Sequence, residues 1–129
     1  MPRAGAQLGL RVVERLSRAE FEELSADEQS KHVQDALGAL RDSVPHGGAE
    51  AAAFLDVRFY VQDLAGWAPA DVQRLWPSYR TEIERSAGDI HASFQDALDS
   101  GLLSPPQAQY AKSCLLAERR LVDVADEYI

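Results

Sequence analysis

The chain has 129 residues, of which 46% are hydrophobic and 26% charged, a composition typical of one globular domain and too apolar for a disordered chain. Thirteen basic against 21 acidic residues give a formal net charge of −8, which disfavours binding to nucleic acids and to anionic membranes. No apolar run approaches the ~20 residues that cross a bilayer, so we expect no membrane span.

The start of the chain and its cysteine content indicate in which cellular compartment the protein is found. Arg3, Arg11 and Glu14 interrupt the first fifteen residues, which therefore lack the long apolar core of a secretion signal. The single cysteine, Cys114, has no partner for an internal disulfide, as is usual in a reducing compartment. We therefore expect a cytoplasmic protein. Lysine is scarce while alanine and arginine are common, which suggests a GC-rich bacterial genome.

Three short patterns mark helix starts along the chain. Ser-x-x-Glu at 17–20 and again at 25–28 are capping boxes, in which the serine accepts from a backbone N–H and the glutamate reaches back. Ser-Pro-Pro-Gln at 104–107 adds a third start, with proline at the first helical position. We expect residues 1–16 to form a partly flexible N-terminal segment and residues 17–129 to form one helical domain.

Clusters of proline and glycine divide this domain. They occur at 45–48, at 66–69, at 76–77 and around Gly101. Between them, apolar residues recur at spacings of three and four, which predicts helices rather than strands. The expected fold is therefore all-α, with four long helices plus two short ones in a bundle-like single domain. The predicted helices lie at about 18–24, 26–43, 49–65, 70–76, 78–99 and 105–128.

The predicted helix 49–65 is apolar on two faces. With ~100° between successive residues, Leu55 and Phe59 fall nearly opposite the wider apolar face. A simple four-helix bundle hides one face of each helix, so these two side chains need further cover. We expect them to lie in an interface, with a second copy of the chain in a homodimer. The alternative is that the two short helices cover them within one chain.

Two tryptophans lie close to the predicted helix breaks. Trp67 precedes Pro69, and Trp76 stands directly before Pro77. Exposed tryptophans beside a proline are typical of a recognition patch, so both join the candidate interface. The alternative is that they fold inward and close one end of the bundle.

Glu118 marks a candidate pocket, because it falls inside the apolar sector of the last predicted helix. A buried carboxylate must be paired or protonated, since an isolated charge there is costly. With His91 and Tyr79, it would line a cavity that binds a small molecule. The alternatives are a structural ion pair with Arg58, Arg80 or His91, or a helix turned so that Glu118 reaches solvent.

No other sequence pattern predicts a metal site or a catalytic residue. The di-metal bundles use Glu-x-x-His steps, and none occurs here. One cysteine and no closely spaced histidine pair exclude a zinc site of the Cys/His type. Cys114 falls on the apolar face of its helix, where a buried thiol is the ordinary expectation. We expect no metal, no cofactor and no catalytic residue.

Three functions remain compatible with the sequence. The first is a non-enzymatic protein-interaction module, such as a small regulator, adaptor or assembly factor, that is homodimeric. The second is an acidic inhibitor or immunity-type protein that binds a basic enzyme. The net charge alone supports this hypothesis. The third is a ligand-binding helical domain or small enzyme that uses Glu118 and His91.

Overall fold

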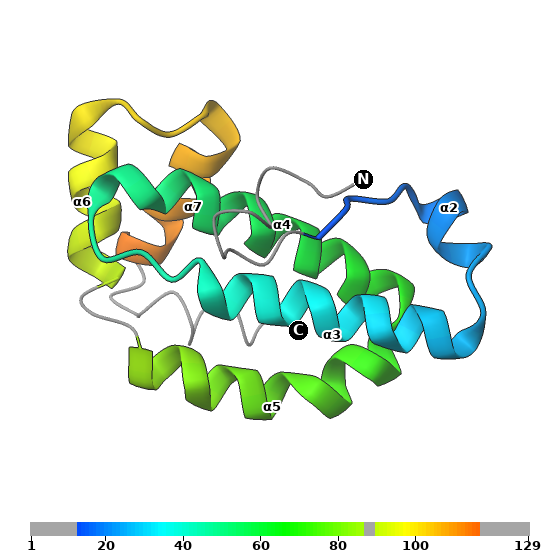
Figure 1. Cartoon of the computed structure of the whole chain (residues 1–129). Helices are drawn as coiled ribbons and strands as arrows, with labels where there is room; N and C mark the ends of the chain where they lie inside the picture. The colour runs from blue at the N-terminus through cyan, green and yellow to red at the C-terminus, as the bar shows by residue number, and fades with distance from the viewer. Residues whose placement is uncertain (1–12, 87–89, 117–129) are drawn as a thin grey trace, which may run out of the picture.

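The computed structural model describes residues 13–86 and 90–116, and this part of the chain is helical without any strand (Figure 1). The predicted all-α class is therefore confirmed. The elements are α2 (Arg18–Glu22), α3 (Ala26–Asp42), the 3-10 turn η1 (Gly48–Glu50), α4 (Ala51–Trp67), α5 (Pro69–Ser86), α6 (Ile90–Ser100) and α7 (Pro105–Leu116).

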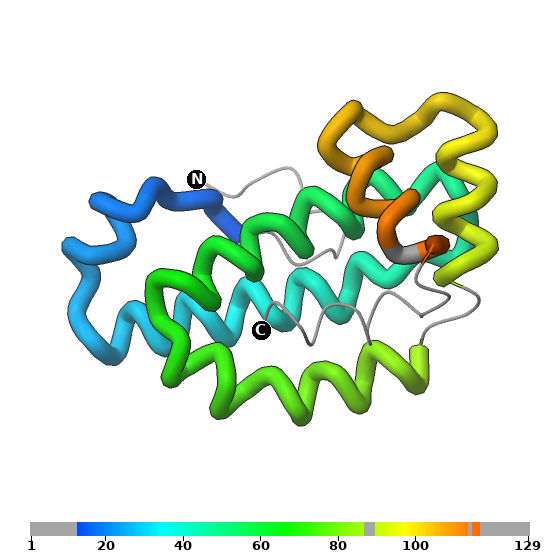
Figure 2. The backbone as a smooth tube through the Cα atoms, turned by 180° about the vertical axis from the view of Figure 1, so that it is seen from behind, coloured from blue at the N-terminus to red at the C-terminus, as the bar shows by residue number. Residues whose placement is uncertain are grey.

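The helices form two packed groups that share α4. Helices α3, α4 and α5 lie against one another, and α2 closes one end of this group (Figure 1). Helices α6 and α7 pack together at the other end, where they contact η1 and α4 (Figure 2). Helix α4 thus has neighbours on several sides.

The first two described helices begin at the predicted capping boxes. Ser17 Oγ accepts from the Glu20 N–H at 3.2 Å, and the Glu20 carboxylate accepts from the Ser17 N–H at 2.9 Å. Ser25 and Glu28 repeat the arrangement at 3.2 and 3.0 Å. These bonds satisfy N–H groups that have no partner within the helix, so the local sequence is enough to place both helix starts.

The predicted break at Trp76–Pro77 is wrong, because α5 continues through Pro77. Val72 and Trp76 before the proline and Ile83 after it are all buried. Burial of both halves in the same group of helices offsets the backbone hydrogen bond that proline removes.

The predicted single helix 78–99 is also corrected. Helix α5 ends at Ser86, and α6 begins at Ile90 and runs in a different direction (Figure 1). The reason is where the apolar residues pack: Phe94 of α6 lies against Phe54 of α4, with ring centroids 6.4 Å apart. The predicted last helix, 105–128, is confirmed as far as Leu116, and its remainder lies outside the described residues.

Candidate functional site

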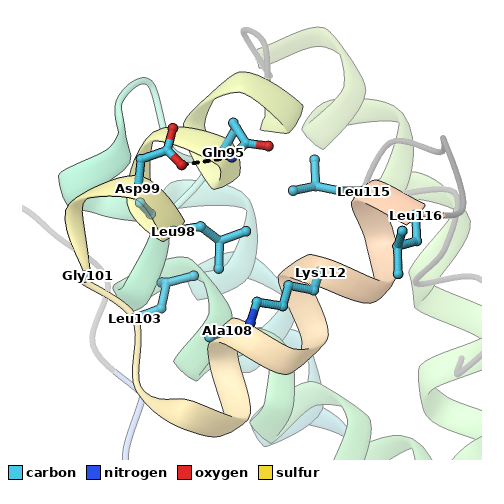
Figure 3. Close-up of a pocket in the computed structure, with 10 residues that line it drawn as sticks. Gln95, Leu98, Asp99, Gly101, Leu103, Ala108, Lys112, Leu115 and Leu116 are labelled. Atoms are coloured by element: carbon cyan, nitrogen blue, oxygen red, sulfur yellow. Dashed lines mark hydrogen bonds between the residues drawn. The ribbon is translucent and has the colours of Figure 1, made fainter.

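A groove of about 570 Å³ lies between α6 and α7. Leu98, Leu103 and Leu115 face the open space, and Asp99 and Lys112 stand at its edges (Figure 3). The complete lining is Gln95, Ala97, Leu98, Asp99, Gly101, Leu103, Ala108, Lys112, Leu115 and Leu116. Its walls are thus largely leucine and alanine with a few polar groups at the rim.

The turn that ends α6 sets the geometry of this groove. Gly101 has a φ of +70°, a conformation that a residue with a Cβ adopts only with strain. The Gly101 N–H donates to the Leu98 carbonyl at 3.3 Å, and the Leu102 N–H donates to the Ala97 carbonyl at 3.1 Å. This is a Schellman end, which stops the helix and reverses the chain so that α7 returns beside α6.

Exposed leucines concentrate at this end of the molecule. Leu116, in the groove lining, is 85% exposed, and Leu102, in the α6–α7 connection, is 50% exposed. They are the large hydrophobic side chains that remain exposed within the described ranges. Among the described residues, Leu116 therefore places an exposed apolar side chain on the wall of an apolar groove.

Helix α7 is fixed to α4 by Gln107, which is buried. Its side-chain amide donates to the Ala52 carbonyl at 3.0 Å and to the Asp56 carboxylate. Its side-chain oxygen accepts from the Ser104 N–H at 3.0 Å, which completes the cap predicted at 104–107. One side chain therefore both begins α7 and holds the helix in place.

Leu55 and Phe59 are covered by their own chain. Leu55 is fully buried, and the Phe59 ring meets the Tyr110 ring edge-on with centroids 5.3 Å apart. Part of the cover that the sequence assigned to a second chain is thus supplied by α7, which packs on α4 through Tyr110. The homodimer expected from the sequence stays a prediction.

The two tryptophans fold inward. Trp76 is 6% exposed and lies under the Arg58 guanidinium, whose carbon is 5.9 Å from the ring centroid. Trp67 is half-buried and packs on Phe21 and Tyr60, at centroid distances of 5.8 and 6.2 Å. Neither forms an open recognition patch, which agrees with the alternative stated for them.

Arg58 is a core residue that could not be recognised as such from the sequence pattern. Its side chain is 1% exposed and is the largest of the fully buried side chains in the described chain. From the sequence, Arg58 was expected only as one partner for Glu118. Nothing in the pattern set Arg58 apart, because the same helix also carries the charged residues Asp56 and Asp63.

The predicted pocket of Glu118, His91 and Tyr79 stays a prediction, because the structure does not describe all three residues. Glu118 lies outside the described residues, as does the side chain of Cys114. His91, on α6, is half-buried, and its Nε2 atom is buried without a hydrogen-bond partner among the described residues. Tyr79, on α5, lies under the Arg41 guanidinium at 5.4 Å, and neither His91 nor Tyr79 lines the groove.

In the part of the chain that the structure describes, no three His, Cys, Asp or Glu side chains are placed to hold a metal ion. Within the same ranges, no helix combines the length and the apolarity that crossing a bilayer requires. No protein family, curated protein or solved structure matches this chain.

Proposed function

We propose that this protein is a protein-interaction module that binds an amphipathic helix of a partner in the groove between α6 and α7. The observation that carries the proposal is Leu116, a leucine 85% exposed on the wall of an apolar groove. Grooves between helices bind partner helices through apolar residues spaced at i, i+3 or i+4, and i+7.

The charge of the protein indicates which helix fits. The rim of the groove carries one acid, Asp99, and one base, Lys112, so the excess of negative charge belongs to the chain as a whole, whose net charge is −8. A partner helix with basic residues beside its apolar stripe would be steered toward this protein. The same charge repels a second copy of the chain, so a foreign partner is favoured over a homodimer.

The test is selection of peptides from a phage-displayed library of helical sequences. We expect the wild-type protein to enrich peptides with leucine-like residues at helical spacing, flanked by lysine or arginine. Leu116→Glu should weaken binding of the selected peptides at least about tenfold, which corresponds to the ~1.4 kcal/mol that one buried apolar anchor readily supplies. Because Leu116 is exposed, this variant should fold normally.

Gln73→Glu is the matched control. It adds the same charge at an exposed position of α5, outside the groove, and should leave binding unchanged. No enrichment, or equal binding to Leu116→Glu, would refute the proposal. Binding that survives Leu116→Glu and disappears at high salt would assign the function to the acidic surface instead. Self-association that Leu116→Glu abolishes would assign the groove to a second copy.

A further inference from the structure

The hydroxyl of Tyr60 connects three separate segments of the chain. The Leu16 N–H donates to this oxygen at 3.0 Å, and His32 Nε2 lies 2.6 Å from it. Leu16 belongs to the residues before α2, His32 to α3 and Tyr60 to α4. Residues 13–17 are called the N-terminal strap below.

These contacts allow an arrangement of the protons in which the Tyr60 hydroxyl both accepts and donates. Its oxygen accepts from the Leu16 N–H, and its own proton points at His32. In this arrangement His32 Nε2 is the acceptor and the imidazole is neutral, with its proton on Nδ1. A doubly protonated His32 would instead donate to Tyr60 and leave the tyrosine proton without its acceptor.

The side chains of the strap make further contacts with the protein. Val13 and Leu16 are only partly buried against the core, and the Arg15 guanidinium lies 5.3 Å from the Tyr60 ring centroid. Helix α2, which follows the strap, is fixed independently, because Phe21 is buried and its carbonyl accepts from the Gln29 side chain at 3.0 Å. Because α2 is held by these contacts of its own, opening of the strap at Ser17 does not require α2 to move.

We propose that the strap is a pH-sensitive latch, which is closed while His32 is neutral and which opens from Tyr60 when His32 is protonated. Protonation removes the acceptor of the Tyr60 proton and places a second cation beside Tyr60, next to Arg15. Opening lets the tyrosine hydroxyl and the imidazolium bind water instead.

The surroundings of His32 set the direction of this response. Burial is the larger influence and lowers the pKa of His32 below its ordinary value, while the carboxylates of Asp35 and Glu14 raise it in part. Burial also raises the pKa of Tyr60, so the tyrosine keeps its proton. The charged groups around the pair are Glu14 and Arg15 of the strap, Glu20 of α2, Glu28, Lys31 and Asp35 of α3, and Asp63 of α4.

The direction of the pH dependence follows from the difference between the pKa of His32 in the open state and in the closed state. In the open state His32 has an ordinary pKa, near 6.5, and in the closed state a lower one. The stabilisation that neutral His32 gives to the closed state is therefore complete above pH ~6.5, and acidification through the interval between the two values favours the open state. Within this interval, the opening equilibrium rises about tenfold for each pH unit.

The experiment is amide hydrogen exchange of the full chain, measured by NMR between pH 8 and 5 and divided by the intrinsic rate at each pH. We expect protection of the Leu16 amide to fall on acidification, by about tenfold per pH unit within the interval. The Glu23 amide, which bonds to Ala19 inside α2, is the internal control and should keep its protection.

Three variants separate the latch from general acid sensitivity. His32→Gln supplies an acceptor that does not titrate, so Leu16 protection should become independent of pH. His46→Gln, at an exposed histidine, should retain the wild-type response. Tyr60→Phe should leave Leu16 unprotected at every pH. Constant Leu16 protection in the wild type, or a pH response that persists in His32→Gln, would overturn the proposal.

Discussion

Gly48 shows how one residue sets the distance between two elements. It begins η1, which packs directly on the backbone of α6. A Cβ at this position would lie 3.0 Å from Asp96 Cβ and 3.1 Å from the Ala97 nitrogen. Both atoms belong to the body of a helix, so neither can rotate away, and glycine is needed here for close approach rather than for its dihedral angles.

Gly48→Ala should therefore destabilise the protein by about 1–3 kcal/mol, the usual cost of overpacking a tight contact. Denaturant unfolding measures this loss. Gly47→Ala is the matched control, because a Cβ on Gly47 meets nothing within 4 Å and its φ of −161° is extended backbone. A Gly48→Ala protein as stable as the Gly47→Ala protein would contradict the close packing of η1 on α6.

At the scale of elements, the features that could be predicted from the sequence are those determined within a few residues. The capping boxes at Ser17 and Ser25 involve partners three residues away, and both are present. Pro77 shows the opposite case, since it predicts a break from local chemistry alone. Its helix continues because Trp76 and Ile83 are buried by distant parts of the chain, which no local pattern encodes.

Pro77→Ala should make the protein more stable by about 1–3 kcal/mol, because an interior helical position recovers its backbone hydrogen bond. Thermal or denaturant unfolding tests this. Pro69→Ala is the control, since Pro69 occupies the first position of α5, where the missing N–H has no helical partner. Its stability should stay close to that of the wild type, and an equal gain in both variants would argue against a specific cost at Pro77.

The candidate site could be predicted only in part, for a reason that belongs to the whole molecule. The two-faced pattern of helix α4 indicated that it needs cover on two sides, and the sequence offered a second chain or the two short helices as that cover. The cover comes from Gln107 and Tyr110, about fifty residues further along the chain. The groove likewise depends on the return of α7 beside α6. Helical periodicity does not show which residues far apart in the sequence pack against each other.

Phe59 tests whether this cover is intramolecular. Phe59→Ala should lower the free energy of unfolding by about 2 kcal/mol, less than for a fully buried phenylalanine, because the ring packs on Tyr110 of the same chain. Sedimentation should give the same mass for the variant and the wild type. A wild-type dimer that Phe59→Ala converts to a monomer would restore the interface first expected from the sequence.

The position of α4 between the two groups of helices has a consequence for how the protein denatures. Loss of α6 and α7 would remove Tyr110 from the Phe59 ring, while loss of α3 and α5 would uncover another flank of α4. If either group of helices unfolded alone, one apolar face of α4 would be exposed to water. The chain should accordingly come apart in a single cooperative step, even though its helices run in two directions.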